Sequence, residues 1–458
     1  MDGRAVASLA PALERYIEDF SPCFKRRSTF RHFRNYLLGL MADMDRKSIE
    51  PIALATGTAV RTMQEFLAFF AWDHVRINRM LLDRVSRRCP EGGIGVIDGS
   101  GHAKRGDKTP GVQRQYCGET GKIDNCVIGQ HLLFTDNDAK NPFCCLLQSD
   151  LYLPESWSED RSRCQEAGIP EEVVHRPRWQ MALEQVKHTL SAGVKLNWTV
   201  FDEEYGQVPD FWQGLEAMGL RAVGEVPANF RAWVKRPACR SMQAGHAARR
   251  VDHLVRHSPA FTGEDWRMCK VKEGTRGPVL WRYRAARVHM TRQDRQANRT
   301  VPTDRRYWLI VMENPATQEI KYVVSNAPES VSAETCIRVL LSRWHIEKWF
   351  ERAKQEAGLG AFEVRTYTSL IRHWLCVRVA MGFLSEQTTR LRKKTSPDHL
   401  RAGSPDRGTH RGETLAERPP FYGGPAQSLP LLPTSKHRIL RKPQAKCQKR
   451  RRAIALSY

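Results

Sequence analysis

Three features are missing from the sequence, and each absence excludes a class of protein. There is no uninterrupted run of about 18 apolar residues, so we expect no membrane-spanning helix. Residues 1–20 mix charged with apolar side chains, which does not fit a secretory signal peptide and predicts a cytoplasmic protein. The 12 cysteines are scattered and contain no Cys-x-x-Cys pair, so we expect reduced thiols rather than ligands of a structural zinc ion.

Acidic residues are also scarce relative to basic ones. The 458 residues include 50 Asp and Glu against 73 Lys and Arg, which gives a net charge of +23. An excess of this size is typical of proteins that bind a polyanion, and nucleic acid is the first candidate. Because 41% of the residues are hydrophobic, the chain is expected to fold into two or three globular domains.

The two ends of the chain differ in character. Residues 1–88 have helical periodicity, and within them residues 48–67 read as two helices around a glycine turn, the outline of a DNA-binding helix-turn-helix. An ordinary antiparallel helix pair explains this pattern equally well. Residues 386–458 hold 17 Lys and Arg against 5 Asp and Glu and have no sustained apolar period, which predicts a basic, disordered tail.

The middle of the chain alternates between strand-like and helical segments. The fold predicted from their order is α/β: a ribonuclease H-like mixed sheet in residues 89–230 and 331–385, preceded by the all-α N-terminal domain. Residues 231–330 are rich in arginine and β-forming residues and are predicted to be a β-rich insertion. The strands of the main sheet are expected at 94–97, 112–117, 123–134, 142–153, 196–201 and 221–226, with helices at 176–191, 208–218 and 343–359.

Acidic residues stand where an apolar strand ends or where a helix borders the core. Asp98 and Asp202 each end an apolar run, and an acidic residue at such a position contributes little to stability. On the last predicted helix, a spacing of 100° per residue puts Arg343, Glu347 and Lys354 on one stripe beside the apolar face. A surface helix with an Arg–Glu ion pair is the plainer interpretation of that helix alone.

The two aspartates and the helical glutamate together form a set of hard oxygen ligands. Such a set suits two Mg²⁺ or Mn²⁺ ions, which promote cleavage and transfer of phosphodiesters. Glu204 is an alternative ligand, because alternate residues of a strand share one face. The pattern therefore indicates nuclease or strand-transfer chemistry.

These residues resemble a known family. Three residues separate Arg343 from Glu347 and six separate Glu347 from Lys354, which is similar to the Tyr-(2)-Arg-(3)-Glu-(6)-Lys signature of DDE-type transposases of bacterial insertion sequences. Leu340 stands where the family has tyrosine. The blocks that begin at Asp98 and Phe201 also look like the first and second aspartate blocks of this family, and the resemblance covers about residues 30 to 385.

The resemblance implies a set of functional residues. Asp98, Asp202 and Glu347 would be the catalytic metal ligands, holding two Mg²⁺ or Mn²⁺ ions. Arg343 would orient Glu347 or contact the DNA backbone, and Lys354 would bind a phosphate. The expected partners are the two DNA ends of the mobile element and the target DNA, and the expected assembly is a homodimer in a nucleoprotein complex.

Four further residues are candidates for DNA binding. Lys104 and Arg105 follow the first aspartate and would neutralise phosphate, although a basic pair in a loop is more often only solvated. The resemblance to transposases with a β-rich insertion implies that Trp266 and Trp281 are candidates to stack on an unpaired base, although core packing is the more common role of such residues. Two other functions fit the sequence: a catalytically inactive DNA-binding regulator derived from a transposase, and a stand-alone nuclease of the same fold.

Overall fold

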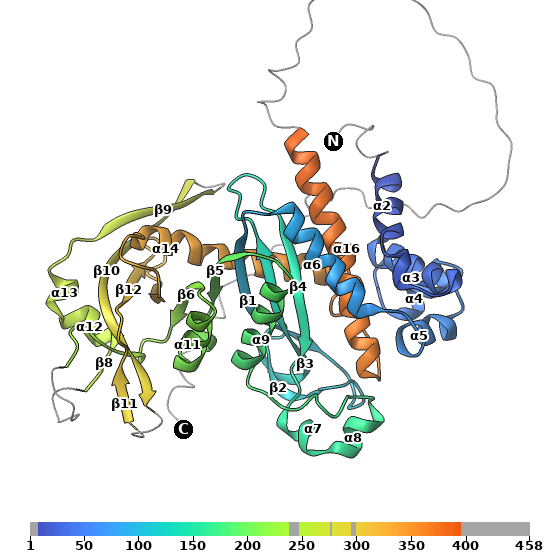
Figure 1. The fold of residues 1–458 in the computed structure, drawn as a ribbon, viewed down its shortest axis with the longest axis horizontal. Coiled ribbons are helices and arrows are strands. Elements are labelled where there is room, and N and C mark those ends of the chain that lie inside the picture. The colour runs from blue at the N-terminus through green and yellow to red at the C-terminus, as the bar shows by residue number, and fades with distance from the viewer. Residues whose placement is uncertain (1–7, 238–246, 275–276, 295–298, 395–458) are drawn as a thin grey trace, which may run out of the picture.

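The computed structural model describes residues 8–237, 247–274, 277–294 and 299–394. In these ranges a group of N-terminal helices, a central sheet with helices on its faces, and a β-rich lobe lie side by side (Figure 1). The described part of residues 1–88 is helical, as predicted. Its helices are α2 (Leu9–Glu18), η1 (Ser21–Cys23), α3 (Arg27–Met41), α4 (Ile49–Ala55), α5 (Val60–Ala68) and α6 (His74–Arg88).

The central sheet has the strand order β4-β3-β1-β5-β6. Strands β1, β5 and β6 are parallel, whereas β3 is antiparallel to both β1 and β4. This mixed order is that of a ribonuclease H-like sheet, so the predicted fold class is confirmed. The strands are β1 (Gly93–Ala103), β2 (Gln113–Cys117), β3 (Lys122–Thr135), β4 (Cys144–Leu151), β5 (Leu196–Phe201) and β6 (Arg221–Val226).

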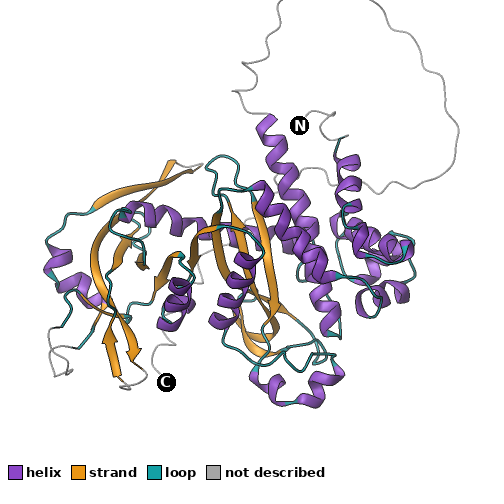
Figure 2. Cartoon of the chain, in the orientation of Figure 1, coloured by secondary structure: helices purple, strands orange, loops and turns teal. Residues whose placement is uncertain are grey.

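Helices cover the sheet because its strands are apolar on both faces. One set of buried side chains includes Val96 and Val200, and a second set on the opposite face includes Ile97 and Phe201. Figure 2 shows the helices against the central strands. The helices of this part of the chain are α7 (Glu155–Glu159), α8 (Arg161–Glu166), α9 (Arg178–Ser191), α10 (Glu203–Gly206), α11 (Pro209–Ala217), α14 (Ala333–Leu340), η2 (Leu341–Arg343), α15 (Trp344–Glu356) and α16 (Tyr367–Lys394).

Helix α16 joins the N-terminal helices to the sheet. Its Arg372 donates hydrogen bonds to the carbonyl oxygens of Leu67 (3.1 Å) and Phe70 (3.0 Å), where α5 ends. Its Arg378 donates to the carbonyl oxygen of Leu146 in β4 at 3.0 Å. The helix continues to Lys394, so residues 386–394 are helical rather than part of a disordered tail, and residues 395–458 lie outside the described residues.

The predicted insertion extends the central sheet. Its strand β13 pairs antiparallel with β6, with Tyr322 opposite Val226 and Val324 opposite Gly224. Strands β12 and β10 continue the same sheet outward. The elements of this lobe are β7 (Arg231–Trp233), β8 (Arg249–Arg250), α12 (Val251–His257), α13 (Pro259–Thr262), β9 (Arg267–Gly274), β10 (Gly277–Asp294), β11 (Arg299–Pro302), β12 (Tyr307–Glu313) and β13 (Ile320–Ser325).

The candidate helix-turn-helix consists of α4 and α5. The turn between them contains Gly57 at a φ of +63°, a conformation that favours glycine. Met63, Phe66 and Leu67 of α5 are fully buried, so this helix packs firmly against its neighbours. DNA binding by this pair stays a prediction. Among the helices in the described ranges, none combines the length and the hydrophobicity needed to cross a lipid bilayer.

Buried histidines lie where the N-terminal helices meet the sheet. The hydroxyl of Tyr36 is 2.8 Å from Nδ1 of His373, and Nε2 of His373 is 3.0 Å from the carbonyl oxygen of Gly358. Burial lowers the pKa of His373 to about 4 and that of His131 to about 3. Both imidazoles are therefore neutral in the native protein near neutral pH.

We predict that these buried imidazoles destabilise the native state as the pH falls below 6.5. The unfolded chain takes up protons on these imidazoles near its usual pKa of about 6.5, whereas native His373 does so only near pH 4. Each such histidine therefore lowers the free energy of unfolding by about 1.4 kcal/mol per pH unit in this window. Denaturant unfolding between pH 7 and 4 measures this slope, and His373→Gln should flatten it.

The matched control for His373→Gln is His253→Gln, because His253 is exposed on α12. A slope that changes equally in both variants would contradict the role of the buried imidazole.

Candidate active site

Three carboxylates form a row across the parallel strands of the central sheet. Val96 of β1 is opposite Val200 of β5, which in turn is opposite Val223 of β6. Two residues further along each strand come Asp98, Asp202 and Glu225. Neighbouring strands lie about 4.8 Å apart, so this register brings the three acidic residues together at the carboxyl ends of β5 and β6.

Local structure fixes the position of Asp202. It is the N-cap of α10, and its Oδ1 accepts a hydrogen bond of 3.0 Å from the backbone N–H of Glu204. Gly206 at the other end of α10 lies so close to the carbonyl oxygen of Glu225 that a Cβ at this position would overlap it. The short helix is thus fixed against β6, which holds Asp202 beside Glu225.

The predicted helical glutamate is connected to this row through Arg343. Residue 343 ends η2 and precedes the first turn of α15, which contains Glu347. Its guanidinium Nη2 donates to Oε1 of Glu347 at 2.8 Å, and Nη1 lies 3.2 Å from Oδ2 of Asp98. The pairing of Arg343 with Glu347 that was inferred from the helical spacing is therefore present. The same guanidinium also contacts Asp98.

The crowding of negative charge changes the ionisation of the aspartates. Burial, together with the charge of Asp202, raises the pKa of Asp98 to about 7, although Arg343 acts in the opposite direction. Burial also raises the pKa of Asp202, with Glu225 adding to the shift and Arg343 and Arg178 opposing it. Burial is the largest cause of both shifts, and a cation bound beside these carboxyl groups would favour their ionised forms.

The donor set fits a hard divalent cation. Asp98, Asp202 and Glu347 offer only carboxylate oxygens, which Mg²⁺ and Mn²⁺ prefer. Within the described ranges, no three Asp, Glu, His or Cys side chains are grouped closely enough to hold a metal ion in this conformation. In this conformation the guanidinium of Arg343 pairs with oxygens of both Asp98 and Glu347.

The two lysines predicted to bind phosphate contact the protein backbone. Lys354 donates to the carbonyl oxygen of Gly101 in β1 at 3.0 Å, and Lys104 donates to that of Gly360 at 2.7 Å. The Lys104 ammonium also lies 3.6 Å from the centre of the Phe362 ring. Both lysines thus support the loop after α15 and the end of β1, close to Asp98.

The other predicted DNA-binding residues lie apart from the row of carboxylates. Arg105 is exposed. Trp281 is only 5% exposed and packs within the core of the insertion. Trp266 is half-buried, and the guanidinium carbons of Arg282 and Arg284 each lie 4.7 Å from the centre of its ring. Of the two tryptophans, only Trp266 offers accessible ring surface.

Sequence reasoning missed two charged residues of the site. Glu225 lies inside a predicted strand, with no break after it to mark it as functional. Arg178, at the start of α9, pairs with Glu204, and its guanidinium fills the space next to Gly99. Residues 203–206 form α10 and do not continue the strand, so the expectation that Glu204 returns to the face of Asp202 by strand alternation is wrong.

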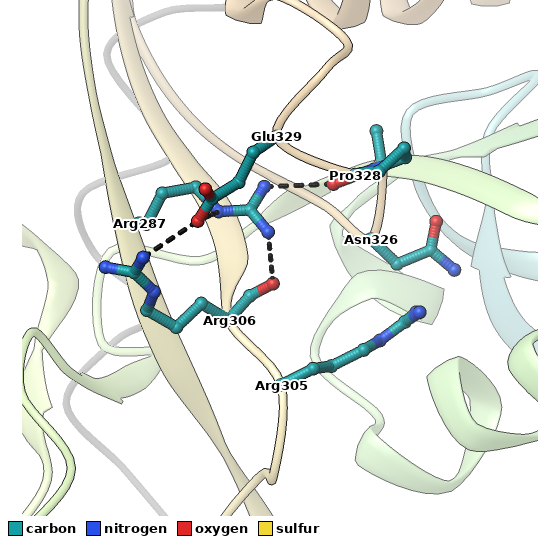
Figure 3. Close-up of a pocket in the computed structure, with 7 residues that line it drawn as sticks. Arg287, Arg305, Arg306, Asn326, Pro328 and Glu329 are labelled. Carbon is teal, nitrogen blue, oxygen red and sulfur yellow. Dashed lines mark hydrogen bonds and ion pairs between the residues drawn. The ribbon is translucent and has the colours of Figure 1, made fainter.

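A separate arginine-lined pocket lies in the insertion, between β10, the start of β12 and the loop after β13 (Figure 3). Arg287 donates to the carbonyl oxygen of Ala327 at 2.9 Å, and Arg306 pairs with Glu329 at 2.8 Å. Arg305 pairs with Glu216 of α11. The guanidiniums of this pocket therefore have acceptors within the protein.

Comparison with known proteins agrees with the fold class and with the expected family. A family model described as DDE superfamily endonuclease matches residues 19–287, and the chain belongs to this family. The matched region contains Asp98 and Asp202. The chain is also similar to a protein of Microchaete diplosiphon named as a probable transposase for insertion sequence element IS701, with 23% identity over 381 residues, 80% of this chain and 85% of that protein. The predicted membership of the DDE class is confirmed.

The raised pKa of Asp98 leads to a prediction about stability. A carboxyl group whose native pKa is near 7, against about 3.8 in the unfolded chain, destabilises the native state when ionised. This penalty disappears as the pH falls from 7 toward 4, because the native protein takes up the proton first. Relative to the Asp98→Asn variant, the wild type should therefore gain about 1.4 kcal/mol per pH unit over this window.

Denaturant unfolding of both proteins in EDTA measures this difference. Asp45→Asn, at an exposed position, is the matched control. If Asp98→Asn and Asp45→Asn show the same dependence on pH, Asp98 is not the group with the raised pKa.

Proposed function

We propose that the protein is the transposase of an insertion sequence, which cuts DNA at the ends of the element and joins the freed 3′ ends to target DNA. The observation that carries the proposal is that Arg343 pairs with both Asp98 and Glu347. Asp202 follows β5 two residues after Val200, which is opposite Val96 of β1, so it lies beside Asp98 at the same end of the parallel strands. Membership of the DDE endonuclease family and similarity to a probable transposase support it.

Each residue has a defined role in this proposal. Asp98 and Asp202 would hold two divalent ions from neighbouring strands, and Glu347 would complete the second ion site from α15. Bound Mg²⁺ or Mn²⁺ would activate the attacking oxygen and stabilise the leaving oxygen. Arg343 orients Glu347. In cleavage, a water oxygen bonds to phosphorus, and the 3′-oxygen of the element end leaves with a proton. In joining, the resulting 3′-hydroxyl attacks a phosphodiester of the target DNA and displaces the 3′-oxygen of the target strand.

DNA is the proposed partner for both steps. The net charge of +23 favours binding to a polyanion, and each of two protomers would engage one DNA end in a nucleoprotein complex. Arg105, on the loop after β1, and Trp266, on the insertion, are accessible positions for contacts with the DNA backbone and with an unpaired base. The pair α4 and α5 is the proposed helix-turn-helix.

The test is a cleavage and joining assay with a duplex that carries the terminal repeats flanking the coding sequence. With Mg²⁺ or Mn²⁺, the wild type should cut at the repeat ends and form joined products. Asp98→Asn should lower both rates by more than about 100-fold, because residues that only support a metal ligand already contribute 10–100-fold. DNA binding by this variant, measured by gel shift, should be retained.

Three results would contradict the proposal in different ways. Full activity of Asp98→Asn would refute the ligand assignment. Cleavage that does not depend on the repeats and yields no joined product would indicate a stand-alone nuclease. Binding to the repeats without any metal-dependent cleavage would indicate an inactive regulator.

Lys354 provides a further prediction. Its ammonium donates to the backbone of β1 three residues after Asp98. Lys354→Met should therefore displace this end of β1. The rate of joining should fall about tenfold or more, as expected for a lost hydrogen bond to a charged group. Lys348→Met is the matched control, since Lys348 lies on the same helix but pairs with Glu351 at 2.6 Å on the exposed face. Equal joining rates in the two variants would assign Lys354 no role in positioning.

A further inference from the structure

Glu225 is the least expected member of the row of carboxylates. It lies on β6, opposite Val323 of the insertion strand β13. Its Oε1 is 2.7 Å from Nζ of Lys321 and 4.0 Å from Nε of Arg343. Its side chain is 20% exposed, so this negative charge is mostly removed from water and depends on these two cations.

Arg343 has three carboxylates around one guanidinium. Its Nη1 and Nη2 bond to Asp98 and Glu347, while its Nε faces Glu225. The arginine side chain is only 19% exposed. A buried guanidinium that loses its acceptors is strongly destabilised, so it must keep at least one carboxylate partner.

Metal binding conflicts with two of these three contacts. A divalent ion at Asp98 needs the Oδ2 atom that Arg343 contacts in this conformation, and an ion at Glu347 competes with Arg343 for the charge of that carboxylate. Asp98 has little capacity to spare, since its other oxygen accepts a hydrogen bond of 2.7 Å from the N–H of Gly99. The nearest alternative acceptor for Arg343 is Glu225.

We propose that Glu225 is a positioning residue that takes up Arg343 when metal ions bind to Asp98 and Glu347, and that it thereby sets the affinity of the site for metal. This inference rests on the proposed metal-binding role of the carboxylates. Glu225 acts through Arg343 and does not itself hold the ion.

Lys321 connects this exchange to the insertion. It belongs to β13, and its ammonium is held by Glu225. While that ion pair is intact, Lys321 competes with Arg343 for the same carboxylate. When the lysine charge is removed, Arg343 is the single cationic partner of Glu225. We therefore expect Lys321 to weaken metal binding and Glu225 to strengthen it.

The test measures Mn²⁺ binding to the full chain by electron paramagnetic resonance of the free ion, without DNA. Glu225→Gln should raise the Kd for Mn²⁺ about 3- to 10-fold, the range typical of coupling between residues in contact. Lys321→Met should lower the Kd. Glu313→Gln, which removes a buried glutamate paired with Arg282 elsewhere in the insertion, is the matched control and should leave the Kd unchanged.

An Arg343→Gln background separates the proposed mechanism from a general effect of charge. If Glu225 acts by accepting Arg343, then Glu225→Gln in this background should change the Kd by less than about twofold, because a pairwise effect vanishes when its partner is absent. An undiminished effect of Glu225→Gln in this background would overturn the inference. So would an unchanged Kd in the single variant.

Two further measurements keep the outcome interpretable. Thermal unfolding shows whether Glu225→Gln is folded. If it is not, the double variant Glu225→Gln/Lys321→Met replaces it, because both partners of the ion pair are then removed together. This double variant should bind Mn²⁺ more weakly than Lys321→Met. Asp98→Asn should abolish Mn²⁺ binding. If it does so while Glu225→Gln has no effect, only this inference fails; if the wild type binds no Mn²⁺, the proposed metal site fails with it.

Discussion

The attraction between the Arg343 guanidinium and the surrounding carboxylates is the interaction on which the site depends. Asp98, Asp202 and Glu225 lie in one row because the register of three parallel strands places them there. Without a cation between them, mostly buried like charges at this spacing would repel one another strongly. Arg343 bonds to Asp98 and to Glu347, and so holds the end of the sheet and the start of α15 together.

The rest of the fold keeps this row in place. On one side, α10 caps Asp202 and packs against the backbone of β6. On the other, Lys354 and Lys104 bond the end of β1 and the loop after α15 to one another. Behind them, α16 attaches the N-terminal helices to β4 through its buried arginines. The carboxylates therefore lie on rigid elements, which is what precise positioning of ligands requires.

The sequence predicted those parts of the structure that have a local signal. The ribonuclease H-like strands and helices follow from apolar periodicity, and Asp98 and Asp202 stand out because they end apolar runs. Glu347 needed the family resemblance, since a helical Arg–Glu pair alone is common. Glu225 has no local signal: the feature that brings it into the row is the pairing of β5 with β6, two strands separated along the chain by α10 and α11.

Side-chain partners were also beyond the reach of the sequence. Whether a lysine faces solvent or a backbone carbonyl depends on the path of a distant loop, and for Lys104 that partner is Gly360. The same holds for Trp281, which is opposite Cys269 of β9 and lies in the same buried apolar cluster as Cys269 and Tyr283. At the C-terminal end, the change in composition after residue 385 suggested a boundary, yet α16 continues through it to Lys394.

The continuity of the sheet bears on how the insertion works. A domain joined only by flexible linkers would move independently of the row of carboxylates. Strand β13, however, is bonded to β6 along its backbone, from Tyr322 to Ser325. Displacement of the insertion would break these hydrogen bonds and the Lys321–Glu225 ion pair together. The β-rich lobe cannot move away from the strands that carry Asp98 and Glu225 without losing this pairing, because lobe and central strands are parts of one sheet.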